Sequence, residues 1–323
     1  MKYKNKISSM LAFFALMFAF TGIAQAAQKY KVGISVPSAD HGWTAGLLWW
    51  AKKAVADIEK KEKDVEFYVV AASSGTKQVG DVEDLMIKGI NALVILPHNP
   101  ATLQKVIEEA YAEGIYTVVV DRELAKPAQD VFIAGDNAGL GRVGAQWMAK
   151  EMAGKGNIVV IEGLQIPINK QRVDAFNEVM AEHKGINILD SQPGDWSTQK
   201  ALSVMENFLQ KHKKIDAVWC QDDDMLKGVM QAIKESGRTD IKTVLGGAGS
   251  KDIIKMIIDD NPVVRATVTY SPSMVASGIA LAVAGVKNET LGNLYHKPTR
   301  VLLGAELIDK SNAKENYFPE AAF

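Results

Sequence analysis

The sequence predicts an α/β protein with two similar lobes, each a doubly wound parallel sheet. Short, continuous apolar runs alternate with longer helix-like stretches along nearly the whole chain, and such runs are typical of parallel strands covered by helices on both faces. The alternation occurs in two successive sets, which favours two lobes over one. The chain length of 323 residues also exceeds what one ordinary hydrophobic core holds.

The first set of elements ends near residue 134. We expect strands at 30–36, 65–71, 92–96, 116–121 and 131–134, and helices at 47–60, 78–88 and 101–113. The second set begins after residues 135–136. We expect strands at 157–161, 186–190, 217–220, 243–246 and 265–268, and helices at 140–153, 172–183, 197–211, 225–235 and 251–260. A last long helix at 274–286 and a late strand at 300–303 complete the pattern.

The first 26 residues are read as a secretory signal peptide. Three lysines make a basic start, residues 10–23 are apolar, and Ala24-Gln25-Ala26 is a small-x-small cleavage signal. Its removal changes the net charge from −1 to −4. This charge and the lack of a basic stripe argue against nucleic acid as a partner. The single cysteine, Cys220, lies in an apolar run and is read as a buried, inert thiol.

Charged and aromatic residues concentrate where expected strands end and helices begin. In open parallel sheets these corners line the ligand crevice. A helix cap or a surface ion pair explains any one such residue, but the set favours one shared crevice with polar groups and aromatic walls. The corner residues are Asp40, His41, Trp43, Asp121, Arg122, Arg172, Trp196, Asp222, Asp223, Asp224 and Tyr270.

Three patterns admit other functions. Residues 139–144 match the G-x-G-x-x-G of dinucleotide-binding proteins, but the tight strand–turn–helix is missing, so close helix packing is favoured. The run Asp222-Asp223-Asp224 lacks the ligand spacing of a calcium loop and is read as a helix cap with one acid turned inward. His41 with Asp121 could form an acid–base pair, but no nucleophile motif accompanies them. We therefore expect no metal, no cofactor and no catalytic residue.

The sequence resembles periplasmic sugar-binding proteins of the ribose-binding type, the receptors of ABC importers. The resemblance covers essentially the whole mature chain. Its motifs are the strand at 31–36 with its aromatic corner, TVVVDR at 117–122, IAGDN at 133–137, QRVDAF at 171–176, SQPGDW at 191–196 and AVWCQDD at 217–223.

The resemblance implies a type 1 periplasmic binding fold, in which two lobes joined by a three-segment hinge close around a monosaccharide-sized ligand. The crossings would fall near residues 135–136, 269–271 and 299–301. Residues 27–134 and 271–300 would then form the N-terminal lobe, and residues 135–270 and 301–323 the C-terminal lobe. The implied protein is a monomeric, periplasmic solute-binding protein that is not an enzyme.

The resemblance also implies which residues contact the ligand. Trp43 and Trp196 would stack on a sugar ring, and Thr44 stands where the family has a second aromatic. Polar contacts would come from His41, Asp121, Arg122, Arg172, Asp222 and Tyr270. These groups suit a small neutral sugar or polyol, since hydroxyls both donate and accept hydrogen bonds and C–H faces pack on indole rings.

The chain departs from the family in the VLGGAG segment at 244–249. The family usually has an aromatic residue at Gly247 and an aspartate at Ala248. These differences argue against ribose in the usual pose and favour a sugar alcohol or a differently substituted sugar. The partner would be the membrane permease of an ABC importer. The alternative is a receptor that passes a small signalling ligand to a chemoreceptor or sensor kinase.

Overall fold

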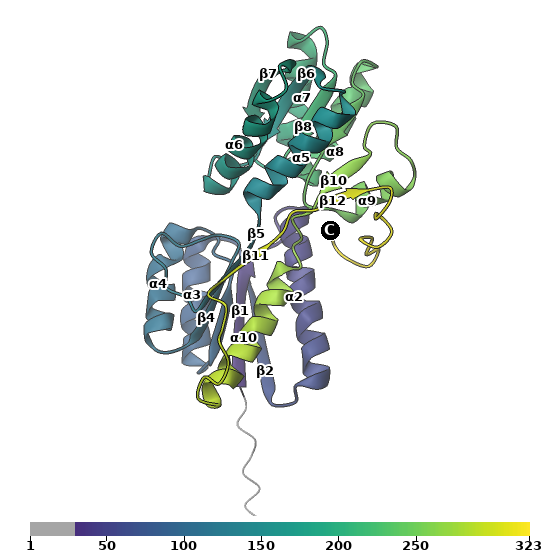
Figure 1. Cartoon of the computed structure of the whole chain (residues 1–323). Coiled ribbons are helices and arrows are strands. Elements are labelled where there is room, and N and C mark those ends of the chain that lie inside the picture. The colour runs from purple at the N-terminus through teal and green to yellow at the C-terminus, as the bar shows by residue number, and fades with distance from the viewer. Residues whose placement is uncertain (1–29) are drawn as a thin grey trace, which may run out of the picture.

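The computed structural model describes residues 30–323. The predicted signal peptide, residues 1–26, lies outside the described residues. Within the described range the chain forms two α/β lobes that meet at a narrow junction (Figure 1). The predicted fold class, two doubly wound lobes joined by a three-segment hinge, is confirmed. No helix between residues 30 and 323 combines the length and apolarity that a membrane span requires.

The first lobe contains a six-stranded, entirely parallel sheet in the order β11-β5-β4-β3-β1-β2. Its strands are β1 (Tyr30–Pro37), β2 (Val65–Ala72), β3 (Ala92–Ile95), β4 (Tyr116–Val120), β5 (Val131–Gly135) and β11 (Arg300–Leu303). Helices α2 (Gly42–Lys61) and α10 (Met274–Thr290) cover one face, and α3 (Gly75–Ile87) and α4 (Pro100–Ala112) cover the other. Both faces are therefore buried, as the continuous apolar strands predict.

The second lobe repeats this layering with a four-stranded parallel sheet in the order β7-β6-β8-β9. Its strands are β6 (Lys155–Glu162), β7 (Gly185–Pro193), β8 (Ala217–Cys220) and β9 (Thr243–Leu245). Helices α5 (Asn137–Glu151) and α6 (Pro167–Ala181) pack on one face, and α7 (Thr198–Lys211) and α8 (Asp223–Ser236) on the other. Helix α9 (Lys251–Ile258) precedes a two-stranded antiparallel sheet of β10 (Ala266–Val268) and β12 (Leu307–Asp309).

Three crossing segments run side by side at the junction of the lobes. The amide of Asp136, after β5, donates to the carbonyl of Leu303 over 2.9 Å. The amide of Thr269, after β10, donates to the carbonyl of Glu306 over 2.8 Å, and the amide of Glu306 donates to Thr269 Oγ1 over 2.8 Å. These bonds tie the three crossings into one connection between the two sheets.

Several expected boundaries differ from the structure; α6, for example, begins at Pro167 rather than residue 172. Strand β11 pairs with β5 through Leu303, so residues 301–303 lie in the first sheet and the third crossing falls at 304–306. Strand β12 was not expected, because its three residues end in an aspartate and do not form a continuous apolar run. Helix α2 begins at Gly42 rather than residue 47, because His41 is extended (φ −149°, ψ 173°) and its amide donates to Thr44 Oγ1 over 3.2 Å.

The glycine pattern at 139–144 lies within α5 and not in the turn before it. A Cβ built on Gly141 would lie 2.1 Å from the carbonyl oxygen of Arg172 in α6. The missing side chain therefore lets the two helices approach closely, and the packing interpretation of these glycines is confirmed. Cys220 is also confirmed as a buried thiol: it has no exposed surface, and this burial raises its pKa.

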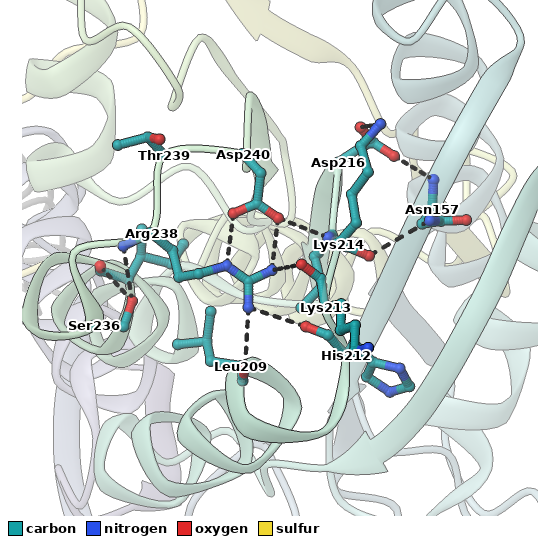
Figure 2. A network of polar contacts seen from close by, with 12 residues as sticks. Asn157, Leu209, His212, Lys213, Lys214, Asp216, Ser236, Arg238, Thr239 and Asp240 are labelled. Carbon is teal, nitrogen blue, oxygen red and sulfur yellow. Dashed lines mark hydrogen bonds and ion pairs between the residues drawn. The ribbon is translucent and has the colours of Figure 1, made fainter.

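A polar network around Arg238 holds the loop between α7 and β8 in place (Figure 2). The guanidinium group donates to Asp240 through Nε and Nη2 over 2.7 and 2.6 Å. Its Nη1 donates to the carbonyls of Leu209 and His212, over 2.9 and 3.0 Å, at the end of α7. Arg238 thus satisfies carbonyl groups that the helix end leaves without a partner.

Candidate functional site

A cavity lies between the two lobes and is lined by residues of both. It contains eight of the nine residues that the sequence assigned to ligand contact, which come from the corners of both sheets, and Ile168 and Ala248 also line it. The eight are His41, Trp43, Asp121, Arg122, Arg172, Trp196, Asp222 and Tyr270.

Thr44 is the ninth predicted residue, and it does not line this cavity. It lies in the first turn of α2, where its hydroxyl accepts from the amide of His41 and donates to Asp40 Oδ1 over 2.7 Å. The side chain is 1% exposed. Thr44 therefore caps the helix that carries His41 and Trp43.

His41 is held by its neighbour in the sequence. Its Nδ1 lies 2.6 Å from Asp40 Oδ1, and because a carboxylate only accepts, Nδ1 is the donor in this contact. Asp121, the other member of the acid–base pair considered above, bonds to Tyr270 instead. The two residues are therefore not paired with each other.

Trp43 contributes ring area to the cavity and not its N–H group. Its Nε1 donates to the carbonyl of Tyr270 over 2.9 Å, and the two rings lie 6.1 Å apart at an angle of 38°. The indole is 8% exposed. A ring fixed in this way offers a flat apolar surface at low cost in side-chain entropy.

Asp121 and Arg122 follow β4, and both point toward the junction. Asp121 has a left-handed backbone (φ 64°), and Tyr270 OH donates to its Oδ1 over 2.5 Å. Arg122 donates through Nη1 to the carbonyl of His98 over 2.6 Å. Its Nε is buried without a hydrogen-bond partner among the described residues and lies 3.8 Å from Asp121 Oδ2.

Arg172 projects from the first turns of α6 and is 4% exposed. Its Nε donates to Asn137 Oδ1 over 2.8 Å, and its Nη1 donates to the carbonyl of Gln221 over 3.3 Å. The guanidinium carbon lies 4.4 Å from the ring centre of Tyr270 and 5.9 Å from that of Trp196. Neutral groups and aromatic faces therefore hold the guanidinium group of Arg172 in place. None of these contacts is with a carboxylate, so the group can form a charged hydrogen bond with a ligand.

Tyr270 joins these groups into one chain of contacts. Besides donating to Asp121, its hydroxyl accepts from Asn137 Nδ2 over 3.2 Å. Burial raises the pKa of Tyr270 far above its usual range, and the charge of Asp121 adds to the rise. The neutral phenol thus connects a carboxylate of the first lobe with Asn137 and Arg172 of the second.

The three consecutive aspartates have separate roles. Asp222 caps α8, and its Oδ1 accepts from the amide of Met225 over 2.8 Å. Asp223 lies in the core and accepts from Ser250 N and Thr267 Oγ1 over 2.6 and 2.9 Å. Burial raises the pKa of Asp222 to about 8, with the Asp224 charge adding to it, and burial raises that of Asp223 to about 7.

The polar groups of residues 30–323 do not form a metal centre. No cluster of three or more His, Cys, Asp or Glu side chains in this range has the geometry to hold a metal ion. The cap interpretation of the aspartate run holds for Asp222.

Three cavity-lining residues have left-handed backbones, and these are Asp121 (φ 64°), Trp196 (φ 57°) and Ala248 (φ 83°). Residues other than glycine rarely adopt this backbone conformation, and those that do are often found at functional sites. A Cβ built on Gly247 would lie 2.6 Å from the carbonyl oxygen of Gln221. The close approach explains why this chain has no aromatic residue at position 247.

Sequence reasoning missed Ile168 as a lining residue and Asn137 as the residue that orients Arg172. Asn137 is the last residue of the IAGDN motif, so a signal for it was present. Ile168 had no signal, because an apolar residue near the start of a helix is indistinguishable from a core residue until the cleft is seen.

The sequence model described as "Periplasmic binding protein domain" matches residues 32–290. The chain belongs to the periplasmic binding protein family. The ribose import binding protein of Bacillus subtilis (strain 168) is 29% identical over 249 residues, covering 77% of this chain and 78% of that protein. The D-apiose import binding protein of Paraburkholderia graminis is 27% identical over 317 residues, covering 97% of each.

Solved structures have the same fold as this periplasmic binding protein. A solute-binding protein of Bacillus halodurans with bound myo-inositol has a TM-score of 0.79 at 19% identity, covering 93% of this chain and 100% of that one. A galactofuranose binding protein has a TM-score of 0.76 at 26% identity, covering 89% and 97%. A Mycobacterium smegmatis solute-binding protein with bound glycerol has a TM-score of 0.77 at 28% identity, covering 91% and 98%.

The cavity of this periplasmic binding protein retains polar atoms that make no hydrogen bond with the described residues. Asp121 Oδ2 is an acceptor, Asp222 Oδ2 belongs to a carboxyl whose pKa is raised to about 8, and Arg122 Nη2 and Arg172 Nη2 are donors. These residues line the cavity together with Trp43 and Trp196. A neutral molecule with several hydroxyl groups and an apolar face would satisfy both kinds of surface.

Proposed function

We propose that this protein is the extracytoplasmic solute-binding component of an ABC importer and binds a neutral monosaccharide or sugar alcohol between its lobes. The observation that carries the proposal is the interlobe cavity, where unpaired acceptors and donors lie beside Trp43 and Trp196. Relatives named for ribose, D-allose and D-apiose support the sugar class. They also favour import over the alternative of a receptor for a signalling ligand.

The eight cavity-lining residues named above are proposed as the ligand contacts. Asp121 would accept hydrogen bonds from ligand hydroxyls, and Arg122 and Arg172 would donate to ligand oxygens. The raised pKa of Asp222 keeps this carboxyl protonated near neutral pH, so it would donate to a ligand oxygen. Trp43 and Trp196 would pack on the carbon face of the ligand. All eight residues except Trp196 have a hydrogen-bond partner in the protein, so most of the site is organised before a ligand arrives.

The protein acts by binding and not by turnover, in the periplasm, after removal of residues 1–26. It works as a monomer and presents the two lobes, closed on the ligand, to the membrane permease. Closure around the ligand would bring the faces of both lobes into the relation that a permease recognises. The N-terminal lobe is proposed as 27–134 and 271–303 and the C-terminal lobe as 135–270 and 304–323, with the last division moved to follow the pairing of β11.

A thermal-shift panel tests this function. Protein refolded from urea, to remove any bound sugar, would be heated with individual pentoses, hexoses and alditols. One or a few of them should raise the unfolding temperature, since a ligand at a hundred times its dissociation constant adds about 2.7 kcal/mol of stability. The Arg172→Ala variant is the matched control and should lose the shift. No shift across the panel would contradict the ligand class, and conversion of a sugar to a product would contradict a binding role.

A further inference from the structure

The first two turns of α2 form a contact face for the second lobe, next to the sugar cavity that the Trp43 ring lines. Helix α2 belongs to the first lobe, and its first turn contains no acidic residue. Asp224 of the second lobe supplies one: its Oδ2 accepts from the amide of Trp43 over 3.3 Å. A carboxylate at this position complements the free N–H groups and the positive end of the helix dipole.

Glycines in α2 make room for this contact. A Cβ built on Gly42 would lie 2.5 and 2.7 Å from the two carboxylate oxygens of Asp224 and 2.9 Å from the ring of Phe323. A Cβ built on Gly46 would lie 2.6 Å from Phe323 Cβ and 3.0 Å from Pro272 Cγ. The helix surface at these two positions is therefore occupied by residues that come from outside the first sheet.

Phe323 reaches α2 on a segment that is anchored to the second lobe. We call residues 310–323, which follow β12, the tail segment. Ala313 is completely buried in the core of the second lobe, and Tyr317 packs against the same core. The Nζ of Lys251, at the start of α9, donates to the carbonyl of Ala321 over 2.5 Å. In Figure 1 this yellow segment lies between α9 and the upper end of α2.

The end of the tail segment then packs on the first lobe. Phe323 is 7% exposed and lies in the same apolar cluster as Leu47 of α2. The ring of Phe318 meets that of Trp50 edge to face at 5.6 Å. One segment thus contacts α9 in one lobe and α2 in the other.

We propose that Asp224 and Phe323 form a latch that holds the two lobes together in the absence of a ligand. A rotation about the three crossings that separates α2 from α8 moves α2 away from Asp224, and one that separates α2 from α9 moves it away from the anchored part of the tail segment. Both contacts are therefore made in the closed arrangement and lost in the open one, so they shift the equilibrium toward closure. Neither residue lines the sugar cavity.

The distance between the lobes tests the latch directly. Spin labels would be placed at Lys105→Cys in α4 and Lys170→Cys in α6, whose side chains are 88% and 75% exposed. The native Cys220 is completely buried and stays unlabelled. Pulsed electron paramagnetic resonance on the sugar-free protein then reports the populations of short and long distances.

We expect a population of short distances that Asp224→Asn and Phe323→Ala each reduce by about threefold or more, as loss of a helix-end charge or a buried ring predicts. Asp252→Asn is the matched control, because Asp252 shares Lys227 with Asp224 but makes no contact with α2. Lys314→Ala is the control within the tail segment, because this side chain is exposed. Both controls should leave the populations unchanged.

Distance distributions that are the same in the two latch variants and the parent protein would overturn the proposal. A parent protein with no short distances would overturn it as well. Two independent variants are used, so that misfolding of one still leaves the other to decide. Because the samples contain no sugar, the result does not depend on the proposed ligand class, and a failed sugar panel would leave it intact.

Discussion

The hydroxyl of Tyr270 donates a hydrogen bond of 2.5 Å to Asp121 Oδ1, although the two residues are 149 positions apart in the chain. Tyr270 lies in a crossing segment between the lobes, and Asp121 follows a strand of the first sheet. Through Asn137 the same hydroxyl is connected to Arg172 of the second lobe. The hinge and both walls of the cavity therefore share one polar chain, and changes at Tyr270 should affect stability and binding together.

Tyr270→Phe should lower the free energy of unfolding by about 1–3 kcal/mol, because it leaves the buried Asp121 carboxylate without its donor. The phenyl ring still fills the space under Arg172, so the loss reports the hydroxyl. Urea denaturation of the sugar-free protein measures it. Tyr111→Phe is the control, since Tyr111 is 45% exposed. Equal stability of the two variants would show that the bond contributes nothing.

Arg172→Ala should weaken sugar binding by more than about 1.5 kcal/mol, or roughly tenfold in the dissociation constant, as loss of a charged hydrogen bond from a closed site predicts. Titration calorimetry with a sugar that is active in the panel measures the change. Lys170→Ala, on the same helix but 75% exposed, should bind normally. An unchanged dissociation constant in Arg172→Ala would remove this residue from the site.

Tryptophan fluorescence should respond to a bound sugar, because Trp43 and Trp196 wall the cavity. Replacing both with phenylalanine should abolish the change, whereas Trp147→Phe in α5 should preserve it. Emission spectra recorded along a titration make the comparison. A spectrum that does not change at saturation would argue against stacking by either ring.

Asp222 should make stability fall with rising pH. Folding raises its pKa to about 8, mainly through burial, so the native state binds more protons than the unfolded chain between about pH 4 and pH 8. The contribution of this carboxyl is full below about pH 4 and is lost as the pH rises through about 8. Asp222→Asn removes it, so the variant should gain stability relative to the parent protein over this window.

Urea denaturation between pH 4.5 and 8.5 measures this difference, whose slope for one group is at most about 1.4 kcal/mol per pH unit. Asp190→Asn is the control, and its stability difference from the parent protein should stay constant between pH 4.5 and 8.5. A hydrogen bond from Lys211 lowers the pKa of Asp190 to about 2, so its contribution is present above about pH 4 and is lost only in more acidic solution. A flat difference for Asp222→Asn across the window would contradict the raised pKa.

Alanine at two helical glycines should act in opposite directions. Gly80→Ala in α3 meets no atom within 4 Å and should raise the free energy of unfolding by up to about 1 kcal/mol through helix propensity. Gly46→Ala in α2 gains the same propensity but collides with Phe323 and Pro272, so it should be destabilising. Thermal denaturation of the two variants compares them directly. If both variants gained the same stability, the tail segment would have to move away from the new methyl group in α2 without a loss of free energy, which would contradict the prediction.

Local patterns in the sequence determined most of the fold. Continuous apolar runs predicted nearly all the strands, because a strand that is buried on both faces is apolar at nearly every position. The start of α2 was not predicted, because its first turn contains Gly42, Trp43 and Thr44 and has no repeating apolar pattern. Strand β12 was not predicted, because its sequence Leu-Ile-Asp ends in a charged residue and does not form a continuous apolar run.

The sequence by itself placed eight cavity-lining residues in one set, because the corners of parallel sheets meet along one edge. Only the tertiary structure decided what each side chain does there. In the structure Thr44 takes part in a helix cap, and Asp121 accepts a hydrogen bond from Tyr270. Asp223 lies in the core of the second lobe, and Asp224 contacts α2 of the first lobe. These outcomes depend on contacts between residues as far as 181 positions apart, which no local pattern of residue types encodes.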